Sequence, residues 1–190
     1  MAVILASQSP RRKQLLEMLG MNFTVIPAKG EETVPAGAGP DETVRVLSLQ
    51  KAAIVAADAD PEDVIIAADT IVWHNDKVLG KPRDEQEAAR MLSALSGNTH
   101  QVYTGVTVRK GDKILSKAEC TNVKFRKLSG SEIDAYIATG EPMDKAGAYG
   151  IQGIGGMLVE KIEGDYANVV GLPTSALADT LEKEFEINLI

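Results

Sequence analysis

The sequence predicts an α/β (α+β) fold in which one long mixed sheet is flanked by helices. Residues 64–73 form a nearly continuous apolar run, which is typical of a central strand covered on both faces. The predicted elements mix hairpins with strand–helix crossings, so we expect parallel and antiparallel pairs in one sheet. The 190 residues contain no internal repeat, and we expect a single domain over residues 1–190 made of two closely joined lobes.

Seven stretches have the composition of strands, with short apolar or alternating runs bounded by turn residues. The clearest hairpin is the one in which Lys110-Gly111-Asp112 separates two alternating segments. The turn Asn75-Asp76 likewise leads into a short strand. In chain order, the predicted strands are residues 2–6, 22–27, 64–73, a short strand after 76, 101–109, 113–127 and 157–163.

Five helices are predicted from apolar periodicity and from residues that favour helix ends. For the first helix, Ser9 suits the N-cap, Pro10 the first helical position and Gly20 the stop. Asp41 is expected to cap the second helix, and Asp84 the third. In chain order, the predicted helices are residues 10–19, 41–57, 84–95, 129–139 and 173–186.

The composition limits the classes of partner. The chain has 20 basic and 27 acidic residues, a net charge of −7, which argues against a nucleic acid polymer because a basic surface supplies most of that affinity. Apolar runs are too short to span a bilayer, so no membrane partner is expected. Cys120 is the only cysteine, which excludes an intrachain disulfide and indicates a reducing, cytoplasmic location. Its place in a strand pattern predicts a buried thiol.

The segment from Ser7 to Arg12 has the features of an anion site. It lies between a strand and a helix N-terminus, where free backbone N–H groups and the helix dipole attract negative charge. Arg11 and Arg12 add guanidinium groups, whose planar fork matches phosphate oxygens. The alternative is a capped surface helix with solvated arginines, and the segment by itself does not decide between them.

Two lysines are further candidates for phosphate binding. Lys51 falls on the apolar face of its helix, between Leu47 and Val55. This position favours a side chain that extends to water over one that enters a ligand site. Lys81, held in extended geometry by Pro82, is placed either to reach a phosphate or to lie in a turn.

Asp69 is the strongest single signal of a functional site. A carboxylate inside an apolar strand is costly to bury unless it is paired, metal-bound or open to a cleft, and perturbed carboxylates cluster at active sites. With Glu31 and Glu32 of an earlier loop, Asp69 makes a candidate ligand set for Mg²⁺ or Mn²⁺. The structural alternatives are solvated loop glutamates and an Asp69 carboxylate that accepts hydrogen bonds from a neighbouring loop.

Residues 144–156 contain five glycines, whose spacing suits either close approach of the backbone to a ligand or a hinge. Within this stretch, Gln152 has the paired donor and acceptor that can read a base edge. The sequence has no P-loop, dinucleotide fingerprint or Gly-x-Ser-x-Gly elbow, so it does not indicate a serine nucleophile. His74 and His100 are expected to be packing or surface residues rather than bases.

Seven motifs together resemble the Maf family of nucleotide pyrophosphatases, in order and over essentially the whole chain. They are Leu5–Arg12, Lys51-Ala52, Ala68–Val72, Gly80-Lys81-Pro82, Leu95–His100, Gly140–Gly153 and Val170–Pro173. The resemblance implies an elongated fold with two lobes around a deep cleft, related to the inosine-triphosphatase fold. It also implies hydrolysis of a nucleoside triphosphate to the monophosphate and pyrophosphate, with a preference for dTTP and UTP.

The same resemblance implies roles for individual residues. Asp69 is the implied catalytic carboxylate, and Glu32 and Asp69 the implied ligands of Mg²⁺ or Mn²⁺. Gly30 stands where relatives often have an apolar residue, which leaves Glu31 and Glu32 both open as the loop ligand. Matching positions at the phosphate and metal site are Ser7, Arg12, Glu32, Lys51 and Lys81, and those linked to the dTTP/UTP-selective branch are Arg12, Thr70 and Gln152. A homodimer is implied by the resemblance alone.

We expect water to attack the α-phosphorus with the assistance of a metal ion, while Asp69 orients or deprotonates that water. The cations expected to offset the phosphate charge are Arg11, Arg12, Lys51 and Lys81. Two other functions compete with this hypothesis. One is a non-catalytic, nucleotide-binding regulator of cell division, and the other is a phosphatase that removes the γ-phosphate.

Overall fold

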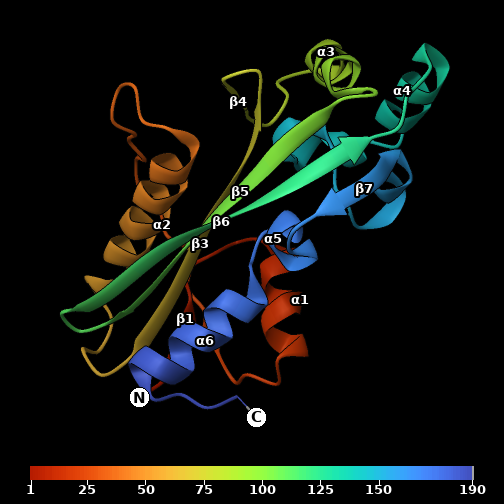
Figure 1. Cartoon of the computed structure of the whole chain (residues 1–190). Coiled ribbons are helices and arrows are strands. Elements are labelled where there is room, and N and C mark those ends of the chain that lie inside the picture. Colours follow the sequence, from red (N-terminus) through yellow and green to blue (C-terminus); the bar gives the residue numbers. More distant parts are fainter. Residues whose placement is uncertain (190) are drawn as a thin grey trace. The chain divides into compact units, whose positions relative to one another are not determined.

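The computed structural model describes residues 1–189, which form a mixed α/β fold (Figure 1). The strands are β1 (Val3–Leu5), β2 (Thr24–Val25), β3 (Val64–His74), β4 (Lys77–Leu79), β5 (Thr99–Lys110), β6 (Lys113–Phe125) and β7 (Val159–Glu163). They make one sheet in the order β2-β1-β3-β5-β6-β7, with β4 paired to β3. The β2–β1 and β1–β3 pairs are parallel, whereas β3–β4 and β6–β7 are antiparallel. The predicted mixed sheet is therefore confirmed.

The helices include all five that the sequence predicts. They are α1 (Pro10–Met18), α2 (Pro40–Ala56), α3 (Glu85–Leu95), α4 (Gly130–Ile137), α5 (Tyr166–Val170) and α6 (Thr174–Phe185). The short helix α5 was not predicted. Residues 144–156 also hold more regular structure than a plain hinge. The 3-10 helices of this region are η1 (Glu141–Asp144), η2 (Ala146–Ala148) and η3 (Gly153–Leu158).

Of the N-caps predicted for α2 and α3, the one for α3 is confirmed and the one for α2 is wrong. The Asp84 side chain accepts a hydrogen bond from the Glu87 N–H at 2.7 Å, as its predicted capping role requires. The prediction that Asp41 caps α2 is wrong, because Gly39 is the N-cap and Pro40 takes the first helical position. Asp41 instead lies in the first turn, where its negative charge complements the helix dipole.

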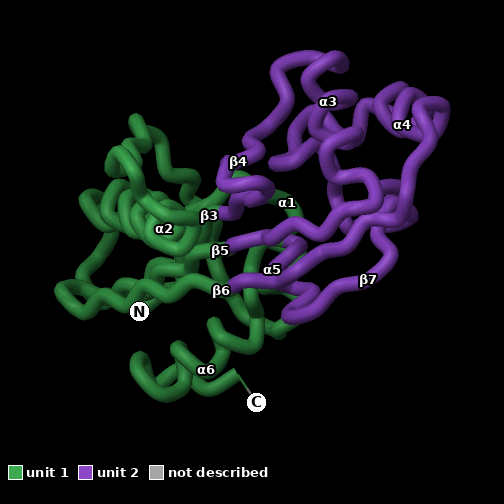
Figure 2. The backbone as a smooth tube through the Cα atoms, turned by 45° about the horizontal axis from the view of Figure 1, so that its top comes forward, with its two compact units in different colours: residues 1–69, 104–119, 171–190 green, residues 70–103, 120–170 purple. Residues whose placement is uncertain are grey.

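The chain divides into two compact units, which Figure 2 shows in different colours. Unit 1 comprises Met1–Asp69, Thr104–Glu119 and Gly171–Ile190, and unit 2 comprises Thr70–Tyr103 and Cys120–Val170. The chain passes from one unit to the other within β3 and β5, and again between Glu119 and Cys120 of β6. Asp69 is the last residue of unit 1 on β3, and Thr70 is the first of unit 2.

The core of unit 1 contains a layer in which α2 packs on the parallel strands β1 and β3. The buried residues of this layer are Ile4, Ala6, Ala52, Val55, Ile65 and Ala67. On β3, the five residues from Val64 to Ala68 are at most 2% exposed, which confirms the strand as buried on both faces. Asp69 therefore directly follows five buried apolar residues, and buried apolar residues resume at Ile71.

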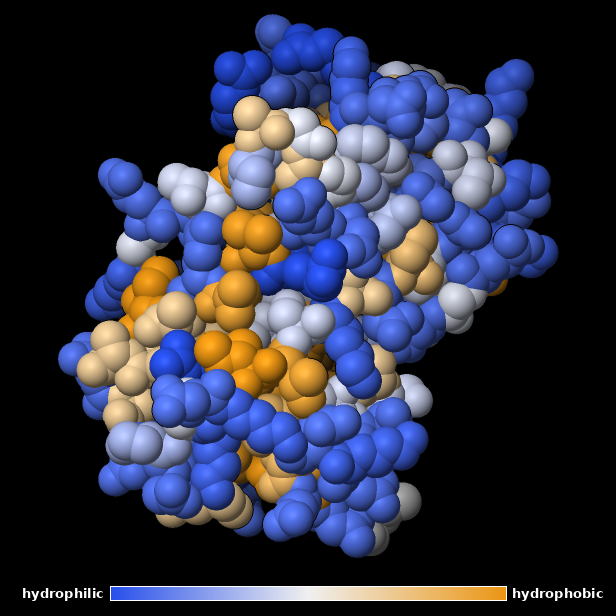
Figure 3. Space-filling view, turned by 60° about the vertical axis from the view of Figure 1, so that its left-hand side comes forward, coloured by the Kyte–Doolittle hydropathy of each residue, from blue (hydrophilic) through white to orange (hydrophobic). Residues whose placement is uncertain are grey.

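Cys120 is exposed, so the prediction of a buried thiol is wrong. On the face drawn in Figure 3, hydrophobic residues form small patches among hydrophilic ones. Among the described residues, no helix has both the length and the apolar character needed to cross a bilayer.

Candidate active site

Two of the predicted site residues in unit 1 contact a third, Lys51, at its ammonium group. This group donates a hydrogen bond to Oδ1 of Asp69 and lies 3.4 Å from Oε1 of Glu32. The side chains of Lys51 and Asp69 are only 16% and 15% exposed. The interpretation that Lys51 simply extends to water is therefore wrong, because both of its contacts are ion pairs in a largely buried position.

The packing of α2 on β3 explains why these groups meet. Ala52 and Val55 lie on the buried face of α2, against the strand that carries Asp69. Lys51 precedes Ala52 on α2, and its ammonium group contacts Asp69 on β3. The pair of charges is thus placed by apolar burial of the two elements that carry them.

A second contact holds α2 in unit 1. Gly105 of β5 lies so close to α2 that an added Cβ would be 2.2 Å from the carbonyl oxygen of Val44. Nearby, the buried hydroxyls of Ser48 and Thr107 are 2.8 Å apart and form a hydrogen bond. Because backbone contact leaves no room for a side chain at residue 105, glycine is required at this position.

The segment that was predicted as an anion site is built around Arg12. Its Nε donates to the carbonyl oxygen of Gly171 at 2.8 Å, and its Nη1 donates to Oγ of Ser7 at 3.2 Å. Oγ of Ser7 also accepts the N–H of Ser9 at 3.2 Å. Ser9 caps α1, with Pro10 following at the start of the helix, so the predicted strand–loop–helix junction is confirmed.

Arg12 lies in a charged environment that includes both acids of the Lys51 group. Burial is the main influence and lowers the pKa of Arg12 below its ordinary value. Asp69 opposes this shift, Arg11 adds to it through like charge, and Glu32 opposes it. Unit 1 therefore brings together Ser7, Arg12, Glu32, Lys51 and Asp69 as one group, which we call the charged cluster. Arg11 lies beside it in the first turn of α1.

The charged cluster can be tested for its fit to a divalent cation. Among residues 1–189, His, Cys, Asp and Glu side chains form no group of three or more that could hold a metal ion. Glu32 and Asp69 nevertheless share one cationic neighbour, Lys51. Mg²⁺ is commonly held by one or two carboxylates while phosphate and water complete its shell, so this donor set fits such an ion. Of the two loop acids, Glu31 and Glu32, it is Glu32 whose carboxylate contacts Lys51.

The remaining predicted residues lie in unit 2. Thr70 follows Asp69 on β3 and is half-buried, and Lys81 is exposed just after β4. Gln152 is half-buried at the N-cap of η3. The N–H of Gly147 donates to the carbonyl oxygen of Gly80 at 3.0 Å, which joins the glycine-rich stretch to the segment that carries Lys81.

Sequence reasoning missed the anchor of Arg12. Gly171 supplies the carbonyl that accepts from Nε, and its φ of +124° is a conformation that favours glycine. The motif Val170–Pro173 that contains it was recognised but was given no role.

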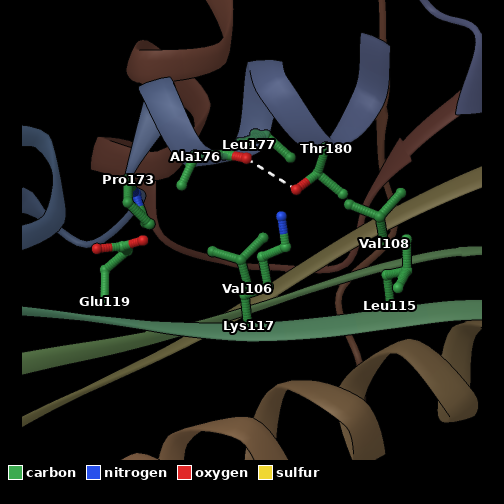
Figure 4. A pocket seen from close by; sticks show the side chains of 9 residues that line it. All are labelled: Val106, Val108, Leu115, Lys117, Glu119, Pro173, Ala176, Leu177 and Thr180. Carbon is green, nitrogen blue, oxygen red and sulfur yellow. Dashed lines mark hydrogen bonds between the residues drawn. The ribbon is translucent and has the colours of Figure 1, made fainter. Parts of the chain in front are cut away.

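Unit 1 also has a small pocket between α6 and the β5–β6 hairpin, lined mainly by aliphatic side chains (Figure 4). Lys117 extends from β6 towards α6 in this view. No predicted site residue lines this pocket.

Comparison with known proteins gives consistent results. A family described as "Maf-like protein" matches residues 2–184. The chain is 50% identical over 187 residues to a "dTTP/UTP pyrophosphatase" of Bacillus cereus, which covers 98% of this chain and 97% of the relative. It is 49% identical to a protein of the same name in Bacillus anthracis, with the same coverage.

Among solved structures, the chain is similar to the Staphylococcus aureus Ham1 protein, with a TM-score of 0.48, 13% identity, and coverage of 66% of this chain and 72% of that one.

Proposed function

The chain belongs to the Maf-like protein family, and from that premise we propose that it is a nucleoside triphosphate pyrophosphatase. Its substrates are dTTP and UTP, and its products are the nucleoside monophosphate and pyrophosphate. The identity of 50% over 98% of the chain to a relative with that name supports this substrate class. The observation that carries the proposal is the charged cluster, where Asp69 lies beside Lys51 and under the influence of Arg12.

The chemistry follows from the charges. A water oxygen forms a bond to the α-phosphorus, the bond from that phosphorus to the β-phosphate oxygen breaks, and pyrophosphate leaves. Asp69 orients the water and accepts its proton. Lys51 and Arg12 offset the negative charge that gathers on the phosphate oxygens, and Ser7 and Arg11 add donors to the phosphates.

The proposal includes a divalent cation, Mg²⁺ or Mn²⁺, with Glu32 and Asp69 as its ligands. When bound, such an ion makes its water more acidic and neutralises phosphate charge. This is supported by the carboxylates of Glu32 and Asp69, which both contact the ammonium group of Lys51. Carboxylate oxygens are the type of ligand that a hard cation accepts. Lys51 then remains available to the phosphates.

Three residues of unit 2 complete the proposed binding set. Gln152 contacts the base through its amide, Thr70 contributes to the preference for dTTP and UTP, and Lys81 contacts a phosphate. These roles are taken from the resemblance and stay predictions, as does the homodimer. A cytoplasmic location is proposed because the one cysteine suits a reducing compartment.

Identifying the products tests the proposal directly. The protein is incubated with dTTP or UTP and Mg²⁺ or Mn²⁺, and the products are separated by ion exchange. Monophosphate and pyrophosphate in equal amounts are expected. Diphosphate with inorganic phosphate would instead identify a phosphatase that removes the γ-phosphate. Tight binding of dTTP without any product would favour the non-catalytic regulator of cell division.

A further inference from the structure

The 3-10 helix η3, which begins just after Gln152, is capped by a side chain from outside the helix. Gln152 is the N-cap residue of η3, but its own side chain makes no capping hydrogen bond in the described structure. The carboxylate of Glu141 takes that role. Oε2 accepts the N–H of Ile154 at 3.2 Å, and Oε1 accepts the N–H of Gly155 at 2.9 Å. A side chain that caps the first N–H groups of a helix normally belongs to the N-cap residue, whereas here it belongs to Glu141, which lies outside η3.

Tyr136 of α4 ties the same network to a second point of the loop. Its hydroxyl donates to Oε1 of Glu141 at 2.9 Å and accepts the N–H of Gly150 at 3.3 Å. Glu141 and Tyr136 therefore hold the chain on both sides of Gln152, at Gly150 before it and at Ile154 and Gly155 after it. All of these residues lie in unit 2.

The glycines of this loop are explained by the same contacts. A Cβ at Gly155 would lie 2.3 Å from the carbonyl oxygen of Gly150 and 2.5 Å from the hydroxyl of Tyr136. Gly153, next to Gln152, has a φ of +77°, and a Cβ there would lie 3.0 Å from Oε2 of Glu141. The chain can approach the carboxylate this closely only without side chains at these positions.

The electrostatics keep Glu141 in the form that accepts hydrogen bonds. Burial by itself would raise the pKa of Glu141, but the hydrogen bonds from Gly155, Tyr136 and Ile154 and the charge of Lys145 outweigh it and lower the pKa. Nζ of Lys145 also donates to the carbonyl oxygen of Glu141 at 2.7 Å. The carboxylate is therefore ionised at neutral pH, and its own backbone is anchored.

We propose that Glu141 and Tyr136 are positioning residues that fix Gln152 for recognition of the pyrimidine base. This inference rests on the proposed function, since it gives Gln152 a base to recognise. The cap supplied by Glu141 removes any need for Gln152 to bond to η3, so its amide is available for a ligand while its backbone is held on both sides. Neither positioning residue touches the substrate.

The test compares base preference in matched variants. For each protein, kcat and KM are measured with dTTP and with dGTP, and the preference is the ratio of the two kcat/KM values. Glu141→Gln replaces the ionised acceptor with an amide whose NH₂ faces backbone donors. We expect its preference for dTTP to fall about tenfold, through a higher KM for dTTP at nearly unchanged kcat. Tyr136→Phe removes one hydroxyl, and a fall of about threefold is expected.

The control is Glu160→Gln, which makes the same change at an exposed residue of β7 that pairs with Lys124. This control should keep the native preference. Should Glu141→Gln fail to fold, the comparison of Tyr136→Phe with the control decides the question. A merely structural role would lower kcat/KM for both nucleotides equally, and an unchanged ratio in both variants would overturn the inference.

Double variants separate this inference from the proposed function. In a Gln152→Ala background, adding Glu141→Gln should cause no further loss of preference, because its effect passes through Gln152. Independent, additive losses would overturn the inference. If Gln152→Ala alone leaves the preference unchanged, both the inference and the role of Gln152 fail. Pyrophosphate release from dTTP still decides whether the chain is a pyrophosphatase.

Discussion

The two units bury polar groups in different ways. In unit 1, Lys51 and Asp69 are buried as a charged pair that keeps about one sixth of each side chain exposed, at 16% and 15%. In unit 2, His100 and Tyr149 are 2% and 5% exposed, and Nε2 of His100 lies 2.8 Å from the tyrosine hydroxyl. Both rings contact Phe125 edge to face, so this neutral pair is enclosed by aromatic packing.

The pKa shifts show what the difference means. Burial is the leading cause of a lowered pKa for both Arg12 and His100. For Arg12, the acids Asp69 and Glu32 oppose that shift. For His100, the charge of His74 adds to it, and the pKa falls to about 3. The charged cluster of unit 1 therefore stabilises buried charge, as phosphate chemistry requires, whereas the aromatic core of unit 2 keeps His100 neutral.

The largest expected effect is on turnover, from Asp69→Asn. The amide keeps the size of the side chain but cannot accept the proton of water, so kcat for dTTP should fall by about 10³-fold or more. Binding of dTTP, measured by calorimetry, should remain within a few fold, because the cations are retained. Turnover is measured by pyrophosphate release.

The matched control is Asp112→Asn, the same replacement at an exposed turn residue. This variant should retain native turnover. If Asp69→Asn were as active as the control, the distinction between a reactive charged cluster in unit 1 and a neutral aromatic core in unit 2 would fail.

The next largest effect is on stability, and it tests how α2 is held. Gly105→Ala would place a Cβ 2.2 Å from the carbonyl oxygen and 2.4 Å from the carbonyl carbon of Val44, both backbone atoms. Overpacking of this kind costs about 3 kcal/mol of unfolding free energy. For a chain of this size that corresponds to a fall in Tm of about 6–12 °C, measured by circular dichroism. Because α2 carries Lys51, turnover should fall as well.

Gly130→Ala is the control for this change, since a Cβ at Gly130 would meet nothing within 4 Å and the residue begins α4. Its Tm should stay the same or rise slightly, because alanine favours a helix over glycine. Equal Tm values for the two variants would mean that the contact of β5 with α2 does not limit stability.

A smaller effect distinguishes the two loop acids. Glu32 lies 3.4 Å from the ammonium of Lys51, so Glu32→Gln removes one charge of the cluster. We expect kcat/KM for dTTP to fall about tenfold to thirtyfold, and the Mg²⁺ concentration needed for half-maximal rate to rise. Glu31→Gln, one residue earlier in an exposed loop, should change either quantity less than threefold. A larger effect of Glu31→Gln than of Glu32→Gln would identify Glu31 as the metal ligand.

The fold was largely predictable because its signals are local. The run from Val64 to Trp73 is apolar at almost every position, and β3 spans Val64–His74. The short helix α5 was missed, since its five residues make too few turns for a helical period to show. Cys120 was misjudged because a strand pattern does not reveal which face a neighbouring element covers.

The candidate site was predictable only where a residue conflicts with its surroundings. Asp69 stood out as an acid inside an apolar strand. The burial of Lys51 was misjudged, because its partners Glu32 and Asp69 lie on other elements that a helical period cannot show. Glu141 lies in the motif Gly140–Gly153, but its role could not be predicted, since the backbone groups it caps lie thirteen and fourteen residues further along the chain.

The smallest effect, a pH dependence of stability, belongs to the neutral core of unit 2. In the unfolded chain His100 has a pKa of about 6.5, and in the fold it is about 3. Well above pH 6.5 both states are neutral and this group does not change the stability. As the pH falls from 6.5 towards 3, the unfolded chain binds a proton that the folded chain refuses, so the free energy of unfolding falls. This group alone should lower it by about 2 kcal/mol between pH 7 and pH 5.

Urea unfolding at pH 7 and pH 5 measures this dependence. His100→Gln, which carries no titratable ring, should be less stable at pH 7 but should lose about 2 kcal/mol less than the native chain on going to pH 5. His74→Gln is the matched control, because His74 is half-buried at the end of β3 rather than enclosed. It should keep most of the native pH dependence. If His100→Gln kept this pH dependence as well, the enclosed His100–Tyr149 pair would not cause the loss of stability at low pH. The contrast between the two units would then rest on the charged cluster of unit 1 alone.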